Sequence, residues 1–289
     1  MRRLISVIAV LLTVLSGLSA QNKSESADSL VRLMSAQSAQ MVTTDDGVNV
    51  RKVIGPARFL HNNTYLICDT ALWYVDSKVI NAFGHVKILQ DETVLTSDKL
   101  NYYIDDDLAQ FRGSVVQLQD KERNTLRTRN LDYNTRDSVA VFRYGASMKD
   151  KDGQLIESDN GSYDSKTKLF TFSQNVNMFT DSVFVNTSEL LYHGDTQLAE
   201  FDRGVDAWKE KDMLSADRGY YDREKEIFRF YDNVHAMSDV QEGWADTLHF
   251  YKLTKNLDMY GNVQLLHASL PPWRSPSTML TASPPSQWR

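Results

Sequence analysis

The feature that most constrains the fold of this chain is a sequence repeat of about 29 residues. Two ladders of mostly apolar residues mark the repeat, and successive members of each ladder lie 29 to 31 residues apart. Each member of the second ladder follows its partner in the first by 13 residues (86 − 73, 115 − 102). The first ladder is aromatic: Trp73, Tyr102, Tyr133, Tyr163, Tyr192, Tyr221 and Phe250. The second is aliphatic: Val86, Val115, Ala146, Val176, Val205, Val234 and Val263. A period of 20 to 50 residues is typical of stacked architectures, in which neighbouring repeats bury a shared core.

Within each repeat, apolar and polar residues alternate with the period of a β-strand. Leu100 and Tyr102, for example, alternate with polar neighbours. Short polar segments such as residues 105–107 separate the strands, and they have the length and composition of hairpin turns. We therefore expect an all-β domain over residues 39–268, built from two-strand units of about 29 residues. Successive strands should pair antiparallel in one elongated sheet.

A glycine or asparagine recurs inside the second strand of every repeat. Both residues tolerate positive φ, and a lone glycine within a strand often marks a bulge or bend. Bends repeated at one height would fold the whole sheet along a line into a trough or flattened tube with an apolar lining. The alternative is that these residues simply end the strands, but alternation resumes beyond them, at Val176 and Met178, which favours the bend. The positions are Gly55, Gly84, Gly113, Gly145, Asn175, Gly204, Asn233 and Gly261.

The two ends of the chain do not follow the repeat. Residues 1–20 combine a basic start, an apolar run and a small residue, Ala20, at the expected cleavage point, which is typical of a secretory signal peptide. A membrane anchor would need about 20 apolar residues, and this run is shorter. Residues 21–38 predict an extended lead-in. Residues 269–289 contain two Pro-Pro pairs and predict a disordered or non-native tail.

Composition and motifs argue against several classes of function. The net charge of −6 is spread along the chain, whereas nucleic-acid binding needs a basic stripe, so we expect no nucleic-acid partner. The single Cys68 lies in strand-like sequence and should pack as a small hydrophobic residue. We find no nucleophile elbow, phosphate loop or pair of acidic residues suited to catalysis. The sequence therefore predicts a protein without catalytic residues or cofactor.

An aspartate or another small polar residue precedes each aromatic position. Stacked carboxylates could suggest a metal site, but calcium needs six or more oxygen ligands on a tight loop, and no such loop pattern is present. The six histidines show no ligand spacing either. We therefore predict no metal site, and we expect the aspartates to shape turns or strand edges. The residues are Asp69, Asp98, Asn130, Asp159, Ser188, Asp217 and Asp246.

The repeats resemble a known family. The clearest match is Thr96-Ser97-Asp98-Lys99-Leu100-Asn101-Tyr102 with Ala109-Gln110-Phe111-Arg112-Gly113-Ser114-Val115. Ser215-Ala216-Asp217 with Tyr221, followed by Phe230-Tyr231-Asp232-Asn233-Val234, repeats the frame. Over about residues 36–267 the chain resembles the LptA/OstA family of periplasmic lipopolysaccharide-transport proteins, in its larger OstA-like form. The resemblance implies a sheet folded over as a β-jellyroll, or β-taco, whose groove shields lipopolysaccharide acyl chains on their way to the outer membrane. It also implies stacking through edge strands, on partners of the same fold or end to end on further copies.

The resemblance and the alternation together predict the groove lining. The same alternation would arise if these side chains filled a closed, dry core, so the groove rests on the resemblance. Two other functions stay open: a structural or adhesive β-repeat scaffold without a lipid, and a polysaccharide-active β-helix enzyme, whose shorter period fits less well. The predicted lining residues are Trp73, Val86, Leu100, Tyr102, Phe111, Val115, Tyr133, Phe142, Tyr163, Phe172, Val176, Tyr192, Phe201, Val205, Tyr221, Phe230 and Val234.

Overall fold

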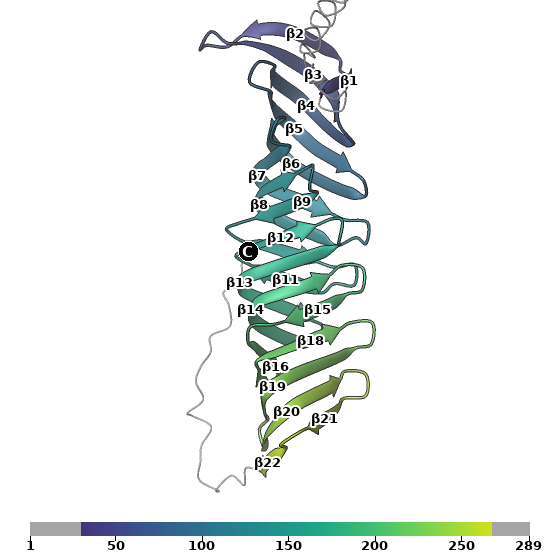
Figure 1. Ribbon diagram of the computed structural model, residues 1–289, viewed down its shortest axis with the longest axis vertical. Helices are drawn as coiled ribbons and strands as arrows, with labels where there is room; N and C mark the ends of the chain where they lie inside the picture. Colours follow the sequence, from purple (N-terminus) through teal and green to yellow (C-terminus); the bar gives the residue numbers. More distant parts are fainter. Residues whose placement is uncertain (1–29, 268–289) are drawn as a thin grey trace, which may run out of the picture.

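The computed structural model describes residues 30–267, which form a long rod made of β-strands (Figure 1). All of their regular elements are strands, and these pair antiparallel in a single sheet of 22, as the repeat predicts. Among these residues no helix is long and apolar enough to span a membrane. The predicted signal peptide and tail lie outside the described residues. The strands are β1 (Arg32–Ser35), β2 (Ser38–Thr43), β3 (Asn49–His61), β4 (Thr64–Tyr74), β5 (Val79–Gln90), β6 (Thr93–Tyr103), β7 (Leu108–Gln119), β8 (Thr125–Asn134), β9 (Val139–Phe142), β10 (Ala146–Lys149), β11 (Leu155–Ser158), β12 (Asn160–Asp164), β13 (Leu169–Thr180), β14 (Val183–His193), β15 (Leu198–Phe201), β16 (Val205–Lys209), β17 (Asp212–Ala216), β18 (Arg218–Asp222), β19 (Ile227–Met237), β20 (Gln241–Tyr251), β21 (Asn256–Tyr260) and β22 (Gln264–His267).

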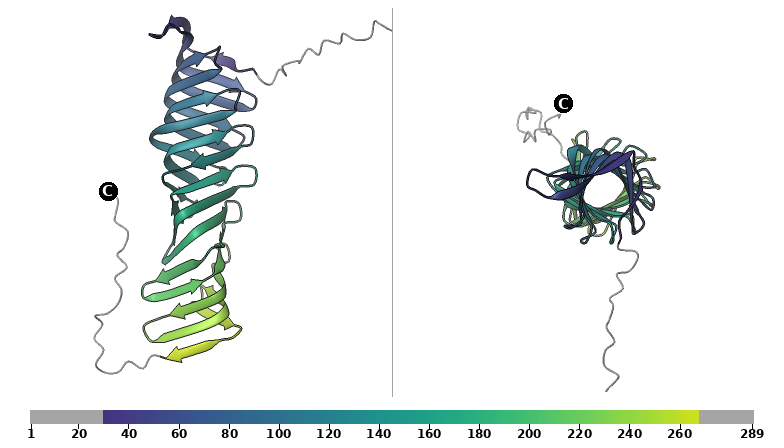
Figure 2. Two further views of the ribbon diagram at one scale, coloured as in Figure 1. Left: turned by 60° about the vertical axis from the view of Figure 1, so that its left-hand side comes forward. Right: turned by 90° about the horizontal axis from the view of Figure 1, so that it is seen from above.

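The sheet is folded along its length into two walls, and the long strands run through both. In β5, for example, residues 86–90 belong to what we call wall 1 and residues 79–83 to wall 2. Wall 1 also holds the short strands β1, β10, β11, β16, β17 and β22, and wall 2 holds β2, β9, β12, β15, β18 and β21. Seen down the long axis, the ribbon closes into a ring (Figure 2). Pairing already begins at β1, inside the segment for which the sequence predicts an extended lead-in.

The bend between the walls, here called the fold line, runs through the recurring glycines and asparagines. Where paired long strands cross this line the pairing register shifts, as it does between Phe83 and Val86 in β5, and elsewhere the strand is interrupted, as between β15 and β16. Gly113 lies on the same line without a positive φ. These observations confirm the prediction that the sheet bends at these residues. Positive φ occurs at Gly84, Gly145, Asn175, Gly204, Asn233 and Gly261.

The recurring aspartates stabilise the fold line by accepting hydrogen bonds across the bend. The side chain of the residue 16 positions later donates to the carboxylate, as Asn175 Nδ2 does to Asp159 Oδ2 (2.6 Å) and Asn233 Nδ2 to Asp217 Oδ2 (2.7 Å). The expectation that these aspartates shape turns or strand edges is therefore wrong, because they lie at the bend itself. Within residues 30–267, no three His, Cys, Asp or Glu side chains come together in a group that could hold a metal ion.

One bend is longer than the others and corrects a predicted lining residue. Along β7 the register moves from Arg112 to Val116, four residues, against two on β8. Other bends, such as residues 173–176 of β13, take only three. The extra residue turns Val115 outward, where its side chain is 53 % exposed, while Val116 is buried. The assignment of Val115 to the lining is therefore wrong, and Val116 takes its place.

Candidate functional site

The other predicted lining residues face the interior of the rod. Trp73 is partly buried against the core near the N-terminal end, where its ring meets Phe59 edge-on. The rest are fully or almost fully buried, so the inner face was predicted correctly there; a role in lipid binding is a separate question. These buried residues are Val86, Leu100, Tyr102, Phe111, Tyr133, Phe142, Tyr163, Phe172, Val176, Tyr192, Phe201, Val205, Tyr221, Phe230 and Val234.

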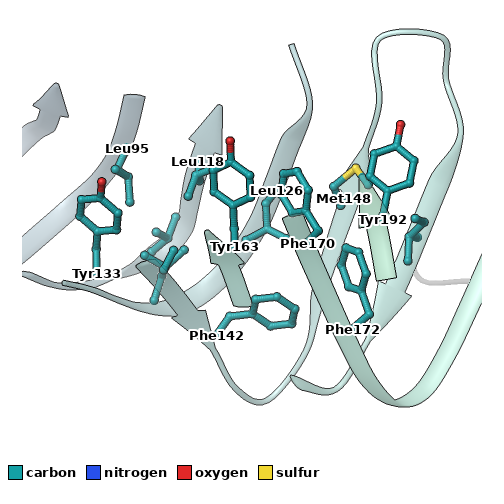
Figure 3. Close-up of a cluster of buried hydrophobic side chains, with 14 of the residues drawn as sticks. Leu95, Leu118, Leu126, Tyr133, Phe142, Met148, Tyr163, Phe170, Phe172 and Tyr192 are labelled. Carbon is teal, nitrogen blue, oxygen red and sulfur yellow. The ribbon is translucent and has the colours of Figure 1, made fainter. Parts of the chain in front are cut away.

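Through the middle of the rod the interior is filled by side chains. Tyr133, Tyr163 and Tyr192 lie side by side on wall 2 with their hydroxyl groups pointing the same way, and aliphatic residues of wall 1 pack near them (Figure 3). The rings of Tyr163 and Phe170 stack with centroids 4.1 Å apart. Each of these aromatic side chains has no exposed surface. A side chain that lines an empty channel would touch water, so this part of the interior is a dry, close-packed core.

Opposite the fold line, the free edges of the two walls meet along a line that we call the seam. Hydrogen bonds cross it: Gln90 Nε2 donates to the Thr135 carbonyl (2.7 Å), and Asn124 Nδ2 to the Gly194 carbonyl (3.3 Å). The turns of wall 1 form edge 1, at residues 61–64, 90–93, 120–124, 150–154, 180–183, 209–212 and 238–241. The turns of wall 2 that face them form edge 2, at residues 75–78, 105–108, 135–138, 165–168, 194–197, 223–226 and 252–255.

Toward the C-terminal end of the seam, positively charged side chains of edge 2 pair with acidic side chains of edge 1. Arg223 donates to Thr180 Oγ1 (2.9 Å), and its Nε lies 3.9 Å from Asp150 Oδ2. The side chains of Arg223 and Asp150 are 10 % and 0 % exposed, so water screens this pair poorly. One turn further on, Lys252 Nζ lies 2.6 Å from Asp181 Oδ2.

The ionisation of this second pair is tuned by its surroundings. Burial lowers the pKa of the Lys252 ammonium, but its hydrogen bonds to Asp181 and Glu226 outweigh that effect and hold the pKa above its ordinary value. The hydrogen bond from Lys252 holds the pKa of Asp181 below its ordinary value. Both groups are therefore charged across the physiological pH range.

Two buried tyrosines reach the seam from inside. Tyr163 Oη donates to Asp120 Oδ2 (3.4 Å), and Tyr192 Oη donates to Asp150 Oδ2 (3.2 Å). Burial and then the neighbouring carboxylates raise the pKa of both hydroxyl groups, so both remain protonated donors. The polar end of each ring thus closes the seam, while its apolar body fills the core.

At the C-terminal end of the rod the interior opens into a cavity of about 630 Å³. Leu214 and Ala236 of wall 1 and Phe228, Phe230 and Met259 of wall 2 form its apolar sides. The polar residues that border it come mainly from two turns of edge 1, at 209–212 and 238–241. The volume lies within the roughly 300–1,000 Å³ of typical ligand pockets.

The cavity is open because edge 1 lacks its counterpart there. In the closed part, each turn of edge 1 contacts turns of edge 2 that follow it in sequence by 43 to 76 residues. Among residues 30–267, no turn of edge 2 follows 252–255 to cross the turn at 238–241, and no hydrogen bond or ion pair joins a turn of edge 2 to the turn at 209–212, whose Lys211 bonds Asp239 of edge 1 instead. The position of the open end therefore depends on contacts between distant repeats.

The sequence prediction missed the part of the cavity that wall 1 supplies. Of the residues that form the apolar sides of the cavity, it included Phe230 of wall 2 but not Leu214 or Ala236 of wall 1. The signal was present, because Ala236 stands two residues beyond Val234 and shares its face of the strand. The alternation could have been followed past the fold line into the second half of each strand.

Comparison with known proteins places the chain in a family. The family described as OstA-like protein matches residues 28–182, more than half of the chain. The chain belongs to the OstA-like family. This confirms the resemblance found in the repeats. The residues around the open cavity, 183–265, lie beyond the matched segment.

No curated protein matches this OstA-like chain. Among solved structures it is similar to LptH of Pseudomonas aeruginosa, described as the LptA homologous periplasmic component of the conserved lipopolysaccharide transport device. The two share 14 % identity over 53 % of this chain and 95 % of that chain, with a TM-score of 0.35.

Proposed function

We propose that this OstA-like protein is a non-enzymatic periplasmic carrier that shields lipopolysaccharide acyl chains within its folded sheet during transport to the outer membrane. The observation that carries the proposal is the apolar cavity at the open end. Phe228 and Phe230 line this cavity and also belong to the core that runs through the rod. An acyl chain that enters the cavity therefore meets a continuous apolar core, which is the proposed path along the rod.

The physical chemistry of such a path suits transport. Burial of each CH₂ group contributes about 0.8 kcal/mol, so a long acyl chain is held strongly without any specific polar contact. Repeats of similar lining also give similar affinity from one position to the next. A lipid can then move along the rod without meeting one site that traps it.

The two ends of the rod support a role within a larger bridge. Within residues 30–267, β1 and β2 at the N-terminal end pair only with β3, and β21 and β22 at the other end pair only with β20. Strands with one unpaired side can pair with another chain. The proposed partners are other transport components with the same fold, or further copies of this chain.

Photo-crosslinking tests the proposal. A photoreactive residue at Met259, which lines the cavity, should form adducts with purified lipopolysaccharide, whereas one at its outward neighbour Asp258 should not. Phe172 and its neighbour Ser173 form the matched pair for the filled core. Adducts at the outward positions alone would refute the proposal.

A scaffold without a lipid is the second candidate, and one observation favours it. The middle of the interior is filled by side chains, as it would be in a purely structural rod. The same experiment separates the two functions, because a scaffold gives no adduct at either Met259 or Phe172.

A further inference from the structure

The two long margins of the folded sheet are held together in different ways. At the fold line every long strand continues from one wall into the other. At the seam, by contrast, each bond between edge 1 and edge 2 within residues 30–267 runs through at least one side chain, as at Gln90 and Asn124. The seam can therefore separate without loss of any strand pairing.

Backbone hydrogen bonds join the successive turns of edge 2 along the rod. A backbone amide of each turn donates to a carbonyl of the preceding turn, as Thr135 N does to Asp107 O (2.8 Å) and Gly194 N to Lys168 O (2.9 Å). The same pattern continues with Lys252 N and Glu226 O (3.0 Å). No such backbone bonds link successive turns of edge 1 in the described residues. Edge 1 is thus the side whose turns can move one at a time.

We propose that the seam is a lateral gate, through which lipid enters the filled middle of the rod sideways, and that Arg223 and Lys252 form its latch. This inference rests on the proposed carrier function. The latch lies where the closed core meets the open cavity: Lys252 holds Asp181, and Val183, two residues further on, already lines the cavity. Opening begins there and proceeds toward the N-terminal end.

The chemistry of the latch fits an anionic amphiphile. Arg223 also donates to the Asp152 carbonyl (3.2 Å), and Lys252 Nζ lies 2.8 Å from Glu226 Oε2. A phosphate group can take the place of these carboxylate and carbonyl oxygens, because arginine and lysine bind both kinds of acceptor. The lipid headgroup then releases edge 1 as its acyl chains enter the interior.

A disulfide across the seam tests the gate. A Cβ atom placed on Gly194 lies 2.7 Å from Asn124 Nδ2, an atom two bonds from the Cβ of Asn124. A cysteine pair in N124C/G194C can therefore reach the Cβ separation of about 3.5–4.5 Å that a disulfide needs. The native Cys68 is buried, and burial raises its pKa to about 11, so its thiol does not compete.

The readout is photo-crosslinking of purified lipopolysaccharide from Phe172 in the core and Met259 in the cavity. The oxidised pair should cut the rate of adduct formation at Phe172 at least tenfold and leave Met259 unchanged. Reduction of the same protein with dithiothreitol is the matched control and should restore the rate. If the oxidised and reduced proteins label Phe172 equally fast, lipid does not pass the seam and the gate is refuted.

A second pair of variants tests the gate independently, in case the disulfide variant does not fold. R223M/K252M removes the latch and should speed labelling at Phe172 several-fold. K225M is the control, because Lys225 lies on the same turn but bonds Asp222 of its own wall. An unchanged rate in R223M/K252M refutes the latch. Labelling of wild type at Met259 but never at Phe172 refutes the gate and leaves the carrier function standing; labelling at neither site refutes both.

Discussion

Phe172 and Phe230 hold the same place in their repeats, 58 residues apart, but they have different surroundings. Phe172 lies in the dry, filled part of the interior. Phe230 borders an open cavity, beside turns of edge 1 to which no turn of edge 2 bonds within residues 30–267. The comparison teaches that closure of the interior is not a property of one repeat. It depends on turns that lie about one and a half to two and a half repeats further along the chain.

The largest expected effect on stability comes from removing an aromatic ring, either from the filled core or from the side of the open cavity. Phe170→Ala empties space in the filled core and should lower the free energy of unfolding by about 3–5 kcal/mol, as large-to-small core substitutions do. Phe250→Ala should cost clearly less, because that ring is only partly buried and already borders the cavity. Denaturant unfolding of both variants measures the difference. Equal losses would mean that the two regions are packed alike.

The next largest difference in stability is expected between an ion pair at the seam and one at the open end. Arg223→Met leaves the buried Asp150 carboxylate without its cation, which typically costs about 3–5 kcal/mol. The lower end of that range is expected, since the closest approach is 3.9 Å. Lys211→Met at the open end breaks only the exposed pair with Asp239 and should leave the unfolding midpoint unchanged. A comparable loss in both variants would contradict the view that the seam closes only one region.

Two glycines of the fold line offer a matched pair with a smaller effect. Gly84 and Gly261 have φ of 73° and 71°, and an added Cβ would lie 2.4 and 2.3 Å from Asp69 Oδ2 and Asp246 Oδ2. Alanine at either site suffers the left-handed backbone penalty of about 1–2 kcal/mol as well as this clash. Gly84→Ala should lower the free energy of unfolding of the whole rod by this backbone penalty and by the cost of the clash. Gly261→Ala should lower it less, because an end repeat can open locally. Thermal unfolding monitored by circular dichroism compares them, and the reverse order would argue against a frayed open end.

The smallest effect concerns two histidines. The hydrogen bond from His85 to Asp69 raises the pKa of His85, whereas burial and then the charge of Arg229 lower the pKa of His249 at the open end. His85 therefore contributes stability that is present below pH 6.5 and is lost as pH rises through its folded-state pKa. His249 acts in the opposite sense: stability is present above pH 6.5 and falls as pH drops toward its folded-state pKa. NMR titration should place the His85 midpoint above that of His249, and Asp69→Asn should lower the first alone.

Much of the architecture could be predicted from residue spacing. The alternation identified the inner face, and the recurring glycines and asparagines identified the fold line, because both are local consequences of backbone geometry. The failure at Val115 is also local. Gly113-Ser114-Val115-Val116 contains two adjacent valines, and either one could follow the bend. Only the pairing register of β7 with β8 shows that the bulge takes one residue more.

The seam and the open end could not be predicted in this way. Arg223 and Asp152 are 71 residues apart, and no sequence pattern links them. Their contact depends on how far the tilt of the strands displaces edge 2 relative to edge 1. Small changes of twist at each repeat add up along the rod, so the partner of a given turn is set by the whole stack.

The sequence alone determined that this chain is a stacked antiparallel sheet, bent once per strand, with aromatic residues such as Tyr163 inside. These properties follow from the two-residue period of a strand and from the few residues that accept a bend. Only the tertiary structure decided where the interior is closed and where it is open. The physical reason is that closure needs side chains from distant repeats to meet across the seam, and their distance depends on the accumulated geometry of every strand between them.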